Sequence, residues 1–165
     1  ISDRVKIFMS LSFILGNLSN ATYTDVLILL CPTIAGLIVM LIYAKELNIL
    51  ATGEELAQTM GVNSERLIFI LIFLLSLVVG VSVSFAGAIG FVGIMVPHAG
   101  RLILGQDARL LVPASFLGGG IFLILSDTIA RTIISPTEIP VGIVTAFFGA
   151  PFFLFILLRT KNQNG

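Results

Sequence analysis

Residues able to do acid–base or nucleophilic chemistry are scarce in this sequence. His98, the single histidine, follows Pro97 and could relay protons near a helix end or act as a hydrogen-bonded structural residue. Cys31, the single cysteine, lies in an apolar run and is expected to be a small buried hydrophobe. The sequence holds no H-E-x-x-H or G-x-S-x-G motif and no paired carboxylates within an apolar segment. We therefore expect no enzymatic activity, no metal site and no cofactor.

Asp127 and Arg131 are the first pair of residues with a possible role. Their spacing of four places them on one helix face, where they can form an ion pair that lowers the cost of leaving charges near a membrane. Arg131 could instead bind a carboxylate of an external partner. Both interpretations remain open from the residues alone. The segment that follows, 135–138, is polar and begins with Ser-Pro.

The loop over residues 45–66 is the second feature. Thr52 followed by Glu55 resembles a capping box, and Gly61 is a typical helix stop. We expect an amphipathic helix of about eight residues between them. Its apolar side would carry Leu56, Ala57 and Met60, and its polar side Glu54, Glu55, Gln58 and Thr59. Such a helix is either a docking element of the helix-in-groove kind or an incidental surface helix.

The composition decides the class of protein. Of 165 residues, 57% are hydrophobic and only 11% are charged, too few to cover the surface of a water-soluble domain. Lys and Arg number nine, as do Asp and Glu, so the formal net charge is zero and nucleic-acid binding is not expected. The chain reads as a membrane protein whose surroundings are lipid. Because it starts at Ile1 without a signal-peptide pattern, we expect it to be a piece of a longer product.

Charged residues divide the chain into membrane spans. Uncharged stretches predict spans over 26–44, 67–85, 91–104, 110–130 and 139–158, with residues 7–18 as the end of an earlier span. The stretch from 67 to 100 is too long for one span, at about 51 Å of helix against about 30 Å of hydrocarbon. We expect the chain to reverse near 86–90, among three glycines at positions 87, 90 and 93.

The distribution of basic residues orients these spans. With the reversal, Arg131 alone falls on one side of the membrane, and all other basic residues fall on the opposite side: Arg4, Lys6, Lys45, Arg66, Arg101, Arg109, Arg159 and Lys161. By the positive-inside rule, the 45–66 loop and the C-terminus are cytoplasmic. The expected fold is an all-α, polytopic transmembrane helical bundle of five full spans plus the end of a sixth. The whole of 1–165 forms one transmembrane domain.

Small residues spaced four apart mark helix faces that can approach closely. They include Ala114 with Gly118, Ser115 with Gly119, and the set Gly142, Ala146 and Ala150. Such stripes usually serve helix packing in a membrane, and less often line a passage.

Three segments resemble a known family. They are NILATGEELAQTMGVN, the run GAIGFVGIMVPHAGRLILGQDARLLVPASFLGGGIFLILSDTIAR, and SPTEIPVGIVTAFFGAPFFLFILL. These look like the C-terminal half of FecCD-type permease subunits of iron-chelate and cobalamin ABC importers, over about Asp25 to Leu158. The resemblance implies a ten-span permease in the inner (plasma) membrane of a prokaryote. It also implies pairing with a second permease copy, as a homodimer or heterodimer. Two cytoplasmic ATPase subunits would hydrolyse ATP, and an extracytoplasmic binding protein would deliver a ferric siderophore, haem or cobalamin.

The resemblance also assigns roles to individual positions. It implies that the ATPase-coupling loop comprises Thr52, Gly53, Glu54, Glu55, Leu56, Ala57, Gln58, Thr59, Met60 and Gly61. Arg131 matches an arginine that pairs with a glutamate of the binding protein. Gly142, Ala146 and Ala150 lie on the last helix, near the passage or the dimer interface. Because the family's first four spans have no counterpart here, we expect no transport by this chain alone. The alternative is a fragment of an ion-coupled secondary transporter or channel, for which only Asp127 and His98 could serve as ion sites.

Overall fold

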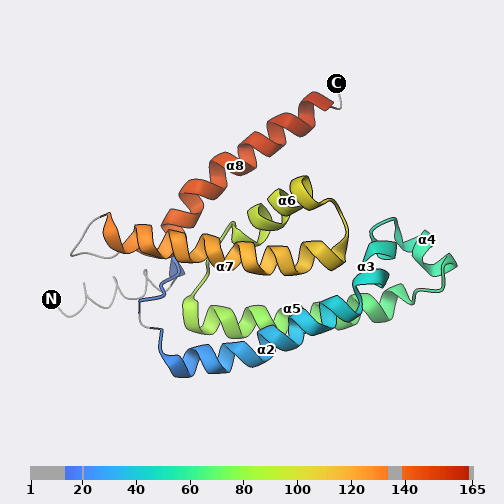
Figure 1. The fold of residues 1–165 in the computed structure, drawn as a ribbon, viewed down its shortest axis with the longest axis horizontal. Helices are drawn as coiled ribbons and strands as arrows, with labels where there is room; N and C mark the ends of the chain where they lie inside the picture. Colours follow the sequence, from blue (N-terminus) through green and yellow to red (C-terminus); the bar gives the residue numbers. More distant parts are fainter. Residues whose placement is uncertain (1–13, 20, 134–138, 164–165) are drawn as a thin grey trace. The chain divides into compact units, whose positions relative to one another are not determined.

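The computed structural model describes residues 14–19, 21–133 and 139–163. Within these residues the chain forms helices and no strand (Figure 1). The helices are α2 (Tyr23–Ile42), α3 (Ala44–Leu50), α4 (Glu54–Thr59), α5 (Ser64–Ala86), α6 (Val92–Leu104), α7 (Ala108–Thr132) and α8 (Val141–Gln163). The predicted sixth span, over residues 7–18, lies mostly outside the described residues.

Each of the five predicted spans coincides with a helix. Three of them, α2, α5 and α7, have 20, 23 and 25 residues and are long and apolar enough to cross a membrane. At 1.5 Å per residue they measure about 30 to 38 Å, which matches a hydrocarbon core of about 30 Å. The other two are shorter apolar helices, Val92–Leu104 and the Val141–Ile156 part of α8. The described part of the chain is all-helical, as the sequence predicts for an integral membrane protein.

The long uncharged stretch is interrupted where its glycines predict. Helix α5 ends at Ala86 and α6 begins at Val92. Between them Gly87 has a φ of 71° and Phe91 a φ of 68°, a conformation that costs little for glycine but is unusual for phenylalanine. Residues 67–100 therefore do not form one continuous helix.

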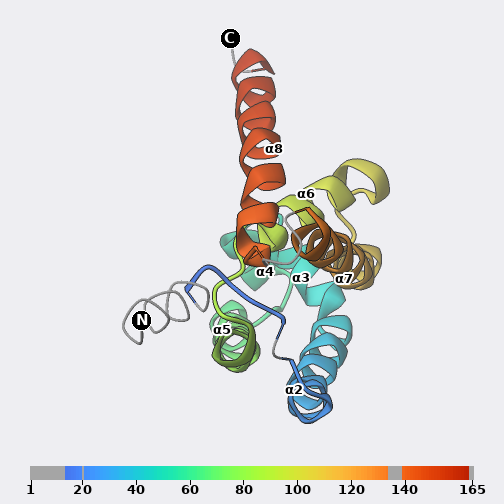
Figure 2. The ribbon, with the colours of Figure 1, turned by 90° about the vertical axis from the view of Figure 1, so that its left-hand side faces the viewer.

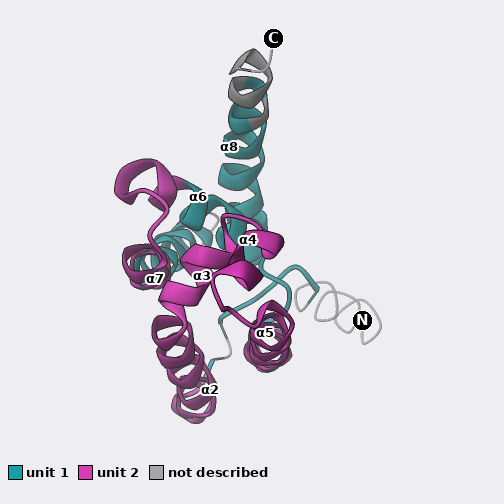
Figure 3. Ribbon diagram, turned by 90° about the vertical axis from the view of Figure 1, so that its right-hand side faces the viewer, with its two compact units in different colours: residues 1–21, 86–98, 117–165 teal, residues 22–85, 99–116 magenta. Residues whose placement is uncertain are grey.

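The chain divides into two units (Figure 3). One unit comprises residues 22–85 and 99–116, in which α2 and α5 run side by side (Figures 1 and 2). Their close approach depends on Gly36, because a Cβ atom there would lie 3.1 Å from Cδ2 of Leu74 and 3.2 Å from Cγ2 of Val78. Helix α2 opens with a capping box between Thr22 and Asp25, and Asn63 caps α5 by accepting from the Arg66 amide at 3.0 Å.

The expected burial of Cys31 is wrong. This residue is exposed on α2, a helix in which Gly36 is the single buried residue. An apolar run in a membrane protein predicts contact with lipid or another segment as readily as burial in the chain's own core.

The other unit comprises residues 1–21, 86–98 and 117–165, and its described part packs closely around the start of α8. Val141 and Thr145 are almost fully buried. A methyl group added at Gly142 would overlap the carbonyl oxygen of Leu15, and one at Gly149 would overlap the ring of Phe91. Gly142 and Gly149 therefore serve packing within the chain, which is the commoner of the two uses expected for small residues.

Candidate functional site

The 45–66 loop folds into two short helices joined by a turn. Tyr43 is the C-cap of α2, and α3 starts directly after it. Helix α4 follows after Ala51, Thr52 and Gly53. The Thr52 hydroxyl donates a hydrogen bond to the carbonyl of Ile49 at 2.7 Å, so it closes the end of α3. The predicted capping box between Thr52 and Glu55 is wrong. Gly53, with a φ of 126°, takes the N-cap position, and α4 has six residues instead of about eight.

The predicted stop at Gly61 is confirmed. Gly61 has a φ of 84°, and its amide donates to the carbonyl of Gln58 at 3.0 Å. The next amide, of Val62, donates to the carbonyl of Ala57 at 2.9 Å. These two bonds form a Schellman motif, which satisfies carbonyls that a helix C-terminus otherwise leaves without partners.

Helix α4 is anchored by one small residue and presents two large ones. Ala57 is fully buried, whereas the other five residues of the helix are exposed. Leu56 is 57% exposed and Met60, its C-cap, is 64% exposed. The predicted apolar side is thus only partly used by the chain itself. Two adjacent apolar side chains, flanked by Glu54 and Glu55, remain available for contact.

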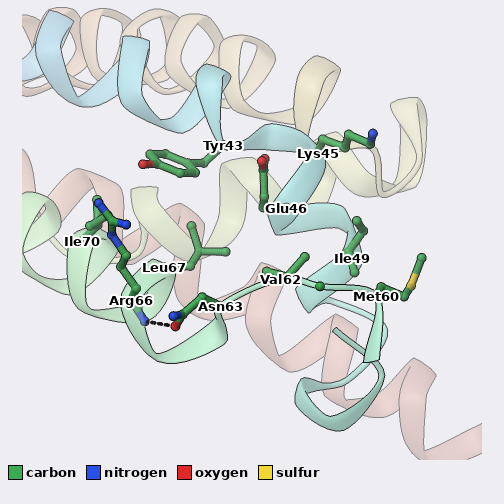
Figure 4. Close-up of a pocket in the computed structure, with 11 residues that line it drawn as sticks. Tyr43, Lys45, Glu46, Ile49, Met60, Val62, Asn63, Arg66, Leu67 and Ile70 are labelled. Carbon is green, nitrogen blue, oxygen red and sulfur yellow. Dashed lines mark hydrogen bonds between the residues drawn. The ribbon is translucent and has the colours of Figure 1, made fainter. Parts of the chain in front are cut away.

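An open cavity of about 410 Å³ lies between α3, the turn after α4 and the start of α5 (Figure 4). Lys45 and Glu46 come to it from α3, and Arg66 comes from α5. The Oε2 atom of Glu46 is buried and makes no hydrogen bond within the described part of the chain. The region beside α4 is therefore incompletely filled, and charged side chains line it together with apolar ones.

A feature that the sequence analysis missed fixes the loop from its other side. The side-chain amide of Asn48 on α3 donates from Nδ2 to Oδ1 of Asp107 at 2.8 Å, and its own oxygen accepts from the Ala108 amide at 2.7 Å. Asp107 also accepts from the Arg109 amide at 3.0 Å, as the N-cap of α7. The hydrogen bond from Asn48, and then that from the Arg109 amide, hold the pKa of Asp107 below its usual value. A glycine and an aspartate just before an apolar helix signal such a cap, but nothing in the sequence pairs it with Asn48.

Asp127 and Arg131 form the ion pair that their spacing allows. Nε of Arg131 lies 2.8 Å from Oδ2 of Asp127, and the two side chains are 41% and 25% exposed. A pair of this kind on a helix surface contributes about 0.3 to 0.5 kcal/mol. The internal ion pair of Arg131 is therefore present in the structure. This pair does not exclude a second bond to an external carboxylate. The polar segment 135–138 lies outside the described residues.

The remaining candidates do not converge on a chemical site. His98 packs edge-on against Phe152, with ring centroids 6.3 Å apart. Across residues 14–19, 21–133 and 139–163, no three His, Cys, Asp or Glu side chains group closely enough to hold a metal ion. Of the small-residue set on α8, Ala146 is half-buried and Ala150 is exposed.

Comparison with known proteins identifies the family. The model of the FecCD transport family matches residues 2–159. The chain belongs to the FecCD transport family. Among its relatives, a cobalamin import system permease protein of Halobacterium salinarum is 49% identical over 145 residues, covering 88% of this chain and 39% of the relative. A hemin transport system permease protein of Yersinia pestis is 36% identical over 164 residues, covering 99% of this chain and 49% of the relative.

A solved structure agrees with this FecCD membership. A chain described as a metal-chelate type ABC transporter in an inward-facing conformation superposes with a TM-score of 0.83 at 31% identity. The match covers 89% of the present chain and 47% of that chain. This FecCD chain thus spans less than half the length of the proteins it matches.

Proposed function

We propose that this chain is part of the permease subunit of a binding-protein-dependent ABC importer that brings iron chelates or cobalamin into the cell. The observation that carries the proposal is the FecCD match over residues 2–159. The relatives' names support the substrate class, since they include permeases for cobalamin, hemin, Fe(3+)-citrate and siderophores. The same match favours an ATP-driven importer over the ion-coupled carrier that the sequence alone leaves open.

Thr52 to Gly61 would dock in a groove of a cytoplasmic ATPase. The exposed Leu56 and Met60 support this role, because burial of each large apolar side chain stabilises a complex by about 1.5 to 3 kcal/mol when complete. Helix α3 continues directly from α2, and Asn63 caps α5 three residues after α4's cap. A displacement of α4 by closing ATPases would therefore move two membrane-crossing helices, as alternating access requires.

Arg131 would pair with a carboxylate of the binding protein. Its ion pair with Asp127 supports this by holding the guanidinium in one orientation, so less side-chain entropy is lost when a partner binds. In this arrangement the chain lies in the inner membrane of a prokaryote. Its 45–66 loop and its C-terminus face the cytoplasm. The exposed Ala150, with Ala146, would face a second permease copy or the passage, whereas Gly142 already packs inside the chain.

The experiment is uptake by vesicles that contain the full-length permease and its ATPase, with purified binding protein outside. Candidate cargoes are a ferric siderophore, hemin and cyanocobalamin, each tested with ATP or a non-hydrolysable analogue inside. We expect uptake of one cargo that requires both ATP hydrolysis and the binding protein. Uptake driven by a proton or sodium gradient without ATP would overturn the proposal in favour of a secondary transporter.

A further inference from the structure

Asn48 connects α3 to the start of α7 through both ends of its amide group. Nδ2 donates to Oδ1 of Asp107 at 2.8 Å, and Oδ1 accepts from the amide of Ala108 at 2.7 Å. The residues joined are 59 and 60 positions apart in the sequence. A side chain that satisfies a donor and an acceptor of the same turn fixes both distance and orientation, which an apolar contact does not.

The acceptor side of this link is itself held in place. The Asp107 carbonyl accepts from the amides of Leu110 and Leu111 at 3.1 and 2.9 Å, so Asp107 is part of the first turn of α7. Its carboxylate also accepts from the Arg109 amide. On the other side of the turn, Gly105 has a φ of 81° and donates to the carbonyl of Arg101, which ends α6. Movement of Asp107 therefore means movement of the whole α6–α7 turn.

Packing does not duplicate the link. An open cavity of about 500 Å³ lies between α3 and the start of α7, and Asn48 is on its wall. Leu47, Leu50 and Ala51 line it from α3, and Leu111 and Val112 line it from α7. Since these apolar side chains bound a cavity, the hydrogen bonds of Asn48 form the specific connection between the two elements at this point.

We propose that Asn48 is a positioning residue that ties the 45–66 loop to the α6–α7 turn, so that displacement of α4 reaches this turn as well as α2 and α5. The inference rests on the proposed docking of an ATPase at α4. It adds a third attachment point to the two that the continuous chain supplies at α2 and α5. Without this attachment the loop could still bind the ATPase, but part of the membrane domain would no longer follow it.

Charge exchange across the link provides the test, in vesicles with the full-length permease, its ATPase and the binding protein. Asn48→Asp places two carboxylates at hydrogen-bonding distance, where they repel each other. The double variant Asn48→Asp with Asp107→Asn exchanges donor and acceptor, so the bond between the two side chains and the bond from the Ala108 amide can form again, whereas the bond from the Arg109 amide to the same atom of residue 107 is lost. Gln106→Ala is the matched control, because Gln106 lines the same cavity without a hydrogen bond to Asn48. The measured quantity is the amount of substrate imported per ATP hydrolysed, together with the amount of ATPase bound.

We expect Asn48→Asp to lower the substrate imported per ATP about fivefold to tenfold while ATPase binding stays within about twofold of wild type. The double variant should recover part of the loss, since it restores the bond between the two side chains but not the Arg109 amide bond, and Gln106→Ala should equal wild type. An unchanged ratio in Asn48→Asp would overturn the inference and leave the proposed function intact. The inference also falls if the double variant fails to recover while it folds and binds ATPase normally. A wild-type protein that binds no ATPase would overturn the proposed function and the inference with it.

Discussion

The two candidate contact regions are α4 and the end of α7 around Arg131. They differ in whether their side chains already have partners within the chain. On α4, the backbone is well capped and Ala57 is buried, but Leu56 and Met60 are left exposed. Near the end of α7, the charged groups already bind each other at 2.8 Å. The first region offers apolar surface without a partner, and the second offers a charge that is partly neutralised.

This difference predicts two kinds of binding. Burial of apolar surface is strong and insensitive to salt, whereas attraction between exposed charges is weak and is screened within about 10 Å at 0.1 M ionic strength. A stable subunit fits the first kind, and a partner that arrives and leaves in each transport cycle fits the second. The proposed ATPase and binding protein match the two regions in this respect.

The largest effect is expected from a double substitution on α4. Glu54→Lys together with Leu56→Asp removes an apolar contact and reverses a charge in the proposed interface. We expect ATP-dependent uptake by the full-length protein to fall at least about tenfold, since about 1.4 kcal/mol of lost binding suffices for that. Membrane insertion should not change, because both residues are exposed.

Glu65→Ala is the matched control for that double variant, since Glu65 is an exposed acid just outside α4. It should leave uptake within about twofold of wild type. Normal import by the α4 variant would show that this helix does not dock on the ATPase. The exposed apolar side chains of α4 would then not be a binding surface.

A smaller, salt-dependent effect is expected at Arg131. Arg131→Glu should weaken binding of the binding protein about tenfold at low salt and about twofold at 0.5 M salt, as measured by titration on the full-length permease. Asp127→Asn is the control, because it breaks the internal pair and keeps the cation. Equal losses in the two variants, independent of salt, would mean that Arg131 acts only through its bond to Asp127.

Two positions on α8 separate packing within the chain from contact with another chain. Gly142→Ala should lower the midpoint of thermal unfolding by several degrees, because the added methyl group meets the Leu15 carbonyl. Ala150→Leu should leave that midpoint unchanged and weaken association of permease copies, since Ala150 is exposed. A loss of stability in both variants would mean that Gly142, Ala146 and Ala150 all serve packing within the chain.

The smallest effect concerns pH at the α6–α7 turn. The pKa of Asp107 is lowered in the folded chain, so its contribution to stability is present above its unfolded pKa of about 3.9 and is lost as pH falls through the lower folded value. Between pH 5 and 8 the midpoint of thermal unfolding of Asp107→Asn should therefore differ from that of wild type by a constant amount. The difference should begin to shrink below about pH 4 and continue to shrink as pH falls through the lower folded pKa. A difference that changes near pH 6 to 7 would point to another titrating group.

Sequence reasoning was strongest where one physical constraint dominates. The cost of a charge in lipid places the five helices within a few residues of their bounds, and the glycines predict the break after Ala86. Gly61 ends α4 as expected, because few other residues adopt its positive φ without strain.

Sequence reasoning failed where two signals compete or where distant residues meet. Thr52 carries a capping signal for α4, yet its hydroxyl bonds to α3, because Gly53 supplies the turn between the helices. The pairing of Asn48 with Asp107 joins segments 59 residues apart, and neither residue is unusual in its local context. Such contacts depend on tertiary structure and are not specified by local pattern.

Site-specific photo-crosslinking in the full-length permease, purified with its ATPase, tests whether α4 docks on the ATPase. A photoreactive residue at Met60, 64% exposed beside α4, is compared with one at Leu117, which is equally exposed on α7. We expect an ATPase adduct from position 60 whose yield changes with nucleotide, and none from position 117. Absence of an adduct from position 60, in a preparation where the ATPase is bound and hydrolyses ATP, would contradict the docking of α4.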